Sequence, residues 1–384
     1  MVQRPSSVFL FIGACFLLGA PDLQDKHVTP VTRQSEASHG KTRIYYIAAD
    51  EIDWNYAPAG RNFVTGEAYH LQGDPGARGM INPDNSTYRK AIFREYSDES
   101  FKNLKPRSEE WQHLGIIGPL IRAEVGDTIR IVFKNNATHS YSLHPHGLFY
   151  AKDSEGAPYQ DETSGEAKKD DAVPPGGSYT YVWEVPERAG PAEGEISSTF
   201  WPYHSHVDEG RDINSGLIGP IIVTRRGMAR ADGSPKDVDR EFVTLFALFD
   251  ESLSWYWETN LKRMYGDPSR YDEKDIHVRQ FHYWYPINGF VDGNGPMMTM
   301  RKGERVRWYL FSNPNDVNAN DIHTPHWHGQ TVVVGHMRMD MVSLLPMTSV
   351  TVDMIPDDPG VWLFHCHLPG HIAAGMQTRF RVLP

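Results

Sequence analysis

The sequence has few thiols, fewer basic than acidic residues, and no long apolar run. It contains 2 cysteines in 384 residues, and Cys15 lies near the start, so Cys366 stands alone in the rest of the chain. If the first residues are removed, Cys366 has no partner for an internal disulfide, and its presence needs another explanation. The net charge of -11 argues against binding to nucleic acid or to an anionic membrane surface. No stretch after the first 20 residues predicts a transmembrane span.

Residues 1–20 predict an export signal, because Arg4 precedes an apolar run that is too short to cross a bilayer comfortably. Two alternatives stay open. The run could be a buried first strand or helix, or residues 12–15 could be a lipoprotein cleavage box that attaches a lipid at Cys15. Export predicts a secreted or periplasmic protein.

The sequence does contain one order of features twice. Residues 118–147 and 295–329 each begin with Gly-Pro, alternate as a strand and end in His-x-His-Gly. A second His-x-His follows an aromatic strand in each half, at 200–206 and at 361–367. Such internal repetition predicts two copies of one domain.

The expected fold class is all-β. Short alternating runs such as TIRIVF and SVTVDMI are separated by Gly, Pro, Asn and Asp, a pattern typical of an antiparallel sandwich or barrel. We predict one domain over residues 41–228 and a second over 238–384. The polar, turn-rich segment 225–240 joins them.

Ten of the 18 histidines fall into four tight groups. Residues two apart in a strand face the same side, so each His-x-His pair directs two imidazoles to one place. Eight imidazoles converge if the two copies meet face to face. Such a set suits a redox-capable ion, copper above all, whereas zinc normally takes four ligands. Unrelated surface or core histidines are the alternative.

Cys366 lies between two of these histidines, and in a strand its sulfur would face away from their imidazoles. With His323, His371 and Met376 it supplies two imidazoles, one thiolate and a distant thioether, the donor set of a blue-copper electron-transfer site. A buried inert thiol and a core methionine are the alternatives. In the first half Ser205 stands where Cys366 stands, so no blue copper is expected there.

The ordered motifs HxHG, HxH, HxxHxHG and HCHxxxHxxxxM resemble the copper signature of the multicopper oxidases over most of the chain after residue 41. Residues 41–58, 201–223 and 239–260 resemble the plastocyanin-type domains of ceruloplasmin and hephaestin. The two-domain length is similar to that of the small bacterial laccases. The resemblance implies two tandem cupredoxin domains, each a Greek-key β-sandwich or barrel, with type 1 copper only in the second.

The resemblance also implies four copper ions: one of type 1, one of type 2 and a type 3 pair. The implied ligands are His323, Cys366, His371 and Met376 for type 1; His144 and His326 for type 2; and, for type 3, His146, His204 and His367 on one ion with His206, His328 and His365 on the other. In the two-domain relatives the cluster forms between neighbouring subunits of a homotrimer, and repeated use of one interface can close such a ring. The residues alone leave an interface within one chain open.

The acidic loop 150–177 carries two further implied roles. Glu155 would supply protons for dioxygen reduction and Tyr150 would lie beside the cluster, although Glu155 could also be a solvated loop acid. The resemblance also implies a calcium site, with carbonyl oxygens from Lys152 and Ala167 and carboxylate oxygens from Asp170 and Asp171. A charged, solvated loop without a metal is the alternative.

The implied activity couples one-electron oxidation of a reductant to four-electron reduction of dioxygen to water. Gly370 replaces an aspartate of the blood ferroxidases, and Gln280 and Tyr285 replace their acidic and histidine positions. These departures, with the neighbouring aromatics Tyr283 and Trp284, favour a laccase-like oxidase of phenols or aromatic amines.

Three alternatives remain. Met337, Met339 and Met341 alternate and would suit Cu(I), which supports oxidation of a metal ion, Cu(I) or Fe(II); the stripe could equally be one face of a core strand. A copper nitrite reductase does not need eight clustered histidines. A non-enzymatic copper-binding protein does not need Cys366 between two of them.

Overall fold

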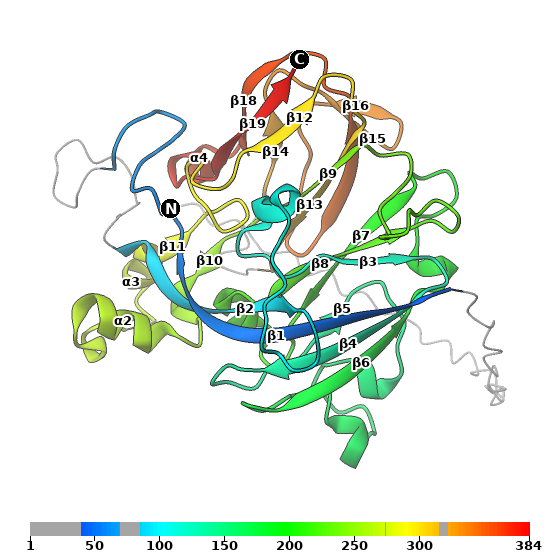
Figure 1. The fold of residues 1–384 in the computed structure, drawn as a ribbon. Coiled ribbons are helices and arrows are strands. Elements are labelled where there is room, and N and C mark those ends of the chain that lie inside the picture. The colour runs from blue at the N-terminus through cyan, green and yellow to red at the C-terminus, as the bar shows by residue number, and fades with distance from the viewer. Residues whose placement is uncertain (1–39, 70–84, 273, 315–321) are drawn as a thin grey trace, which may run out of the picture. The chain divides into compact units, whose positions relative to one another are not determined.

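The computed structural model describes residues 40–69, 85–272, 274–314 and 322–384 (Figure 1). The expected export signal and Cys15 lie outside the described residues, so export remains a prediction. Among the described helices, none has the length and apolarity needed to cross a bilayer.

Two four-stranded sheets make up the first half, and their strands follow from alternating side chains. In β4, Ile129, Ile131 and Phe133 are buried while Arg130 between them is exposed, and β6 buries Tyr181 and Trp183 in the same way. The sheet orders are β2-β1-β4-β6 and β3-β8-β7-β5. Their bounds are β1 Thr42–Asn55, β2 Thr87–Tyr96, β4 Thr128–Asn135 and β6 Ser178–Glu184, then β3 Ile121–Glu124, β8 Ile218–Thr224, β7 Ser198–His204 and β5 His144–Pro145.

A four-stranded and a five-stranded sheet make up the second half, in the orders β12-β19-β18-β14 and β16-β15-β17-β13-β9. Their bounds are β12 Met298–Arg301, β19 Gln377–Leu383, β18 Gly360–Cys366 and β14 Pro325–Trp327, then β16 Met337–Met339, β15 Val332–Val334, β17 Ser349–Met354, β13 Val306–Ser312 and β9 Arg240–Phe246. A short pair, β10 Phe249–Asp250 with β11 Tyr283–Trp284, lies outside these sheets.

Helices are short and lie between strands. The α-helices are α1 Glu209–Ser215, α2 Trp257–Tyr265, α3 Ile276–Phe281 and α4 Pro369–Ala373. The 3-10 turns are η2 Glu109–Leu114, η3 Lys152–Ser154, η4 Gly165–Lys168, η5 Glu187–Ala189, η6 Glu251–Leu253 and η7 Pro268–Arg270. The all-β expectation is therefore confirmed.

The two halves share an apolar core. Strand β13 is buried along its whole length: Phe200 of the first half packs on Tyr309 and Phe311, and Trp308 and Leu310 pack in the core of the second half. Among the described strands, pairing never crosses residues 225–239, which supports the proposed two-domain organisation. The boundaries at 41–228 and 238–384 remain a prediction.

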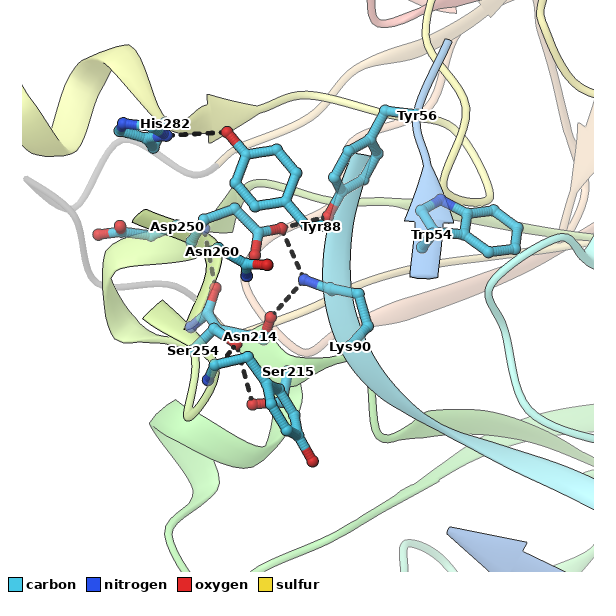
Figure 2. Close-up of polar contacts among 12 residues, drawn as sticks. Trp54, Tyr56, Tyr88, Lys90, Asn214, Ser215, Asp250, Ser254, Asn260 and His282 are labelled. Atoms are coloured by element: carbon cyan, nitrogen blue, oxygen red, sulfur yellow. Dashed lines mark hydrogen bonds and ion pairs between the residues drawn. The ribbon is translucent and has the colours of Figure 1, made fainter. Parts of the chain in front are cut away.

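A buried ion pair also connects the halves (Figure 2). The Lys90 ammonium of β2 lies 2.6 Å from a carboxylate oxygen of Glu251 in η6, and neither side chain is exposed to solvent. The same ammonium donates to the backbone carbonyl of Asn214 in α1, and the Tyr56 hydroxyl donates to Glu251. Because both charges are desolvated, each depends on the other to remain inside the protein.

We therefore expect Lys90→Met to lower the free energy of unfolding by about 3–5 kcal/mol, since it leaves the Glu251 carboxylate buried without a cation. Adding Glu251→Leu should recover most of that loss because no unpaired charge then remains. Urea denaturation measures both. Lys105→Met breaks an exposed pair with Glu95 and is the control, with an expected cost below about 1 kcal/mol. Equal losses of unfolding free energy in Lys90→Met and Lys105→Met would contradict the prediction.

Candidate metal centres

The first centre surrounds Cys366 at the end of β18. Ligand atoms of His323, Cys366 and His371 all lie within 4.8 Å of one another. The Cys366 sulfur is 3.5 Å from Nδ1 of His371, which α4 carries. Met376 is fully buried, and its backbone carbonyl accepts the Cys366 N–H. The structure thus brings together the predicted thiolate and both predicted imidazoles. Met376 is joined to Cys366 by the backbone hydrogen bond.

The chemistry of Cys366 fits a metal ligand. Burial raises the pKa of its thiol, but hydrogen bonds from His323, His371 and two backbone N–H groups outweigh burial and lower the pKa to about 5. The thiolate is the form that binds metals. Two imidazoles and a thiolate form the donor set that suits copper in an electron-transfer site.

The second group of ligands comes from the first half, where β5 and β7 pair His144 with His204. Ligand atoms of His144, His146 and His204 lie within 4.8 Å of one another, and the His206 ring is 5.0 Å from that of His144. Nδ1 of His144 donates to the Glu155 carbonyl at 2.7 Å, which leaves its Nε2 free to bind a metal. We call these four residues the first histidine set.

The second half repeats this geometry on β14 and β18, which pair His326 with His365. Ligand atoms of His326, His328 and His365 lie within 4.8 Å of one another, and the His367 ring is 5.3 Å from that of His326. Nδ1 of His365 donates to the Cys366 carbonyl at 2.8 Å. These four residues form the second histidine set.

Both sets fit metal ions. The Nε2 atoms of His146 and His204 are 3.0 Å apart, and those of His328 and His365 are 3.1 Å apart. Burial lowers the pKa of His146 to about 4 and also lowers the pKa of the other three, so neutral imidazoles face each other at pH 7. Neutral imidazole is the form that ligates metals. Among the described residues, no hydrogen bond or ring contact joins the two sets.

Three methionines that could have belonged to a core strand lie at the surface. Met337 is 64% exposed, Met339 37% and Met341 38%. Met337 and Met339 are the end residues of β16, the edge strand of the five-stranded sheet, and Met341 follows this strand and forms an isolated bridge with His326. The alternative that they form one face of the core is therefore wrong.

Of the aromatic residues expected to contact an organic donor, one is buried in the core and another lies beside the first centre. Trp284 is buried and stacks on Tyr56 with ring centroids 4.7 Å apart, so it belongs to the core. The Tyr285 ring lies 4.8 Å from that of His371, beside the first centre. Gly370 is exposed, and a Cβ there would meet no atom within 4 Å.

Glu155 and Tyr150 both lie near the first histidine set. The Tyr150 ring is 6.1 Å from the His144 ring. Glu155 contacts His144 through its backbone carbonyl, whereas its carboxylate binds the Lys152 ammonium and accepts from the Tyr159 hydroxyl.

The predicted calcium ligands are only partly placed for that role. Asp170 is fully buried and one of its carboxylate oxygens has no partner, whereas Asp171 pairs with Lys168 and the Lys152 ammonium pairs with Asp161. Ala167 lies in the η4 turn. Among the described side chains, sets of three or more His, Cys, Asp or Glu close enough to hold a metal occur only at the three centres above. Calcium therefore remains a prediction.

The sequence analysis did not identify two carboxylates that lie near the first histidine set. A Glu209 oxygen lies 3.7 Å from Nε2 of His206, and Asp212 accepts a hydrogen bond from Ser205. Both lie in α1, shortly after HSH, and their closeness in the sequence to this motif was the available signal.

Residues 113–227 and 265–384 match family models that are each described as multicopper oxidase. The paired sheets have the cupredoxin-like fold of multicopper oxidases. A solved structure described as a multicopper oxidase shares the fold, with a TM-score of 0.56 and 18% identity over 89% of each chain. The chain belongs to the multicopper oxidase family, which implies copper as its cofactor.

Two curated human relatives are similar along most of the chain. Hephaestin from Homo sapiens is 41% identical over 353 residues, which are 90% of this chain and 30% of hephaestin. Ferroxidase HEPHL1 from Homo sapiens is 43% identical over 350 residues, 89% of this chain and 29% of that protein. The chain thus spans about a third of the length of these relatives.

We expect Cys366→Ser to remove the intense visible absorption of the copper-loaded protein, because a thiolate-to-copper transition is its source. The variant should bind one copper ion fewer, while the ions at the two histidine sets remain. Absorption spectroscopy and metal analysis measure the two effects. Met376→Leu, which keeps the thiolate, should retain the band. A colourless unaltered protein with a full complement of copper would contradict the assignment.

Proposed function

We propose that this chain is a metal-ion oxidase that takes electrons from Fe(II) or Cu(I) and reduces dioxygen to water. The observation that carries the proposal is the position of Cys366, whose sulfur lies in the first centre while both of its neighbours, His365 and His367, belong to the second histidine set. Copper ions bound at these centres would accept electrons one at a time and deliver four of them to dioxygen.

Each side chain has a defined part in this proposal. His323, Cys366, His371 and Met376 would hold the type 1 ion, and the backbone of Cys366 connects it to the cluster ligands in both directions. The short Nε2 contacts support the proposed type 3 pairing, in which His146 and His204 share one ion and His328 and His365 share the other. His144 and His326 would hold the type 2 ion.

The relatives support a metal ion as reductant over the phenols and aromatic amines expected from the sequence. One of them is named a ferroxidase, which favours Fe(II). The exposed thioethers of Met337, Met339 and Met341 favour Cu(I) as a second candidate, because soft sulfur ligands select that ion. The neutral residues Gly370 and Tyr285 leave the surroundings of His371 poor in the hard oxygen ligands that iron would use.

Glu155 is proposed to supply protons for dioxygen reduction, with Tyr150 beside the cluster; the Tyr150 ring near His144 and the backbone contact of Glu155 with His144 support these positions, although the Glu155 carboxylate itself contacts Lys152 and Tyr159. Glu209, close to His206, is a further acid in reach of the same set. Glu155→Gln should slow oxygen uptake by the copper-loaded protein, and an unaltered rate would remove Glu155 from this role.

We further propose that the cluster forms between chains, as in a homotrimer. Each proposed type 3 ion takes two ligands from one histidine set and one from the other, yet in the described part of the chain no hydrogen bond or ring contact joins the two sets. His328 and His367 of the second set are exposed to solvent. A neighbouring copy could bring its first set to this exposed face.

With copper-loaded protein, we expect kcat/KM for Fe(II) or Cu(I) to exceed that for a simple phenol by about tenfold or more, a difference of about 1.4 kcal/mol in transition-state free energy. Oxygen uptake with each reductant in turn measures this. Replacing Met337, Met339 and Met341 together by leucine should slow Cu(I) oxidation and leave Fe(II) oxidation unaltered. Cys366→Ser is the inactive control. A phenol rate above both metal-ion rates would contradict the proposal.

Mixed assembly tests the interchain cluster. His146→Ala and His328→Ala each disable one histidine set, so each variant alone should be inactive. Co-expressed, they should regain part of the oxygen uptake, because every mixed ring contains one cluster built from an intact first set and an intact second set. Recovery should coincide with a particle larger than one chain in light scattering. No recovery in a mixed ring would place the cluster within one chain.

A further inference from the structure

The hydrogen bonds around Cys366 in the second half recur in the first half around Ser205, which has a hydroxyl in place of the thiol. The Ser142 N–H donates to the Ser205 hydroxyl at 3.0 Å, just as the Thr324 N–H donates to the Cys366 sulfur at 3.4 Å. The His206 N–H then donates to the Ser142 hydroxyl at 3.0 Å.

The second half repeats that last contact as well, because the His367 N–H donates to the Thr324 hydroxyl at 3.1 Å. The same loop-to-strand contacts thus hold the histidine pair of each half. The two halves differ in what lies opposite Ser205 and Cys366.

Opposite Cys366 stands His371 on α4, and opposite Ser205 stands Asp212 on α1. Asp212 is completely buried. One of its oxygens accepts from the Ser205 hydroxyl at 2.6 Å and from two successive backbone N–H groups, at 3.0 and 3.1 Å, in the turn after His206. The other accepts from the Trp255 indole at 2.8 Å.

Four donors therefore converge on one carboxylate. Burial raises the pKa of Asp212 to about 6, although the hydrogen bonds from Ser205 and Trp255 act in the opposite direction. The group is mostly ionised at neutral pH, and an ionised acceptor makes stronger hydrogen bonds than a neutral one.

We propose that Asp212 is a positioning residue for the first histidine set. Its carboxylate stands opposite Ser205 as His371 stands opposite Cys366, and it ties the end of β7 to α1 so that His204 and His206 keep their imidazoles directed at the proposed cluster. This inference rests on the proposed function, because the set matters only if it holds cluster copper.

The second half takes part in this positioning. Trp255 follows η6, and its backbone N–H donates to the Ser215 hydroxyl at the end of α1. At the same end Asn214 accepts from the Asp250 N–H and from Lys90 (Figure 2). Helix α1 therefore connects the first histidine set to the buried junction between the halves.

Asp212→Asn tests the proposal, because an amide presents N–H groups where the carboxylate accepts. We expect cluster copper to bind about 10–100-fold more weakly, as for other residues that orient metal ligands, while the visible band of the Cys366 centre is retained. Ser205→Ala removes one of the four donors and should have a smaller effect in the same direction. Metal analysis and the type 3 and type 1 absorptions distinguish the two kinds of copper.

A second measurement uses the copper-free protein. Hydrogen exchange at the Val207 and Asp208 amides should become faster in Asp212→Asn, because these two N–H groups donate to the Asp212 carboxylate. Asp127→Asn is the matched control: Asp127 is a buried carboxylate of the same half that binds Arg43 and two backbone N–H groups. It should lower the unfolding temperature and leave cluster copper unaltered.

Unaltered cluster affinity in Asp212→Asn, unaltered exchange at the Val207 and Asp208 amides, or equal loss of both kinds of copper would each overturn the positioning role. The proposed function fails separately, if the unaltered copper-loaded protein oxidises no metal ion. The exchange experiment does not depend on that result.

Discussion

The alternation of side chains along an extended strand is the constraint on which this protein depends. At His365-Cys366-His367 it directs one sulfur to one side and two imidazoles to the other, within three residues of backbone. Two metal centres can therefore share a single strand without sharing a ligand. A helix at this position would place the three side chains around its circumference and separate the donors, so the sheet is a requirement of the chemistry.

The same constraint acts twice, with different outcomes. Each half pairs a strand carrying His-x-His with a loop carrying another, and each fixes the tautomer of a histidine by a hydrogen bond from Nδ1 to a carbonyl, which leaves Nε2 for metal. The second half places a thiolate behind its pair, and the first half places a hydroxyl and a buried carboxylate there. The histidine geometry is thus the same in both halves, and we propose that the groups behind it serve electron transfer in the second half and positioning in the first.

The buried contacts between the halves give these centres a rigid setting. Strand β13 packs against the first half through aromatic rings, and Lys90 with Glu251 places a charge pair in the same junction (Figure 2). Helix α1 begins beside His206 and ends in this junction. The first histidine set and the junction between the halves are therefore connected by one seven-residue helix.

The sequence by itself determined the all-β class, the duplication, the donor set around Cys366 and the absence of a thiolate in the first half. These follow from residue type and from a period of two, which are local properties that any strand obeys. Tertiary structure alone decided that Met337, Met339 and Met341 are exposed and that Trp284 belongs to the core. It also decided that Asp212 lies behind Ser205. Each of these depends on which surfaces pack against one another, and that packing is the sum of many weak contacts between residues distant in the sequence.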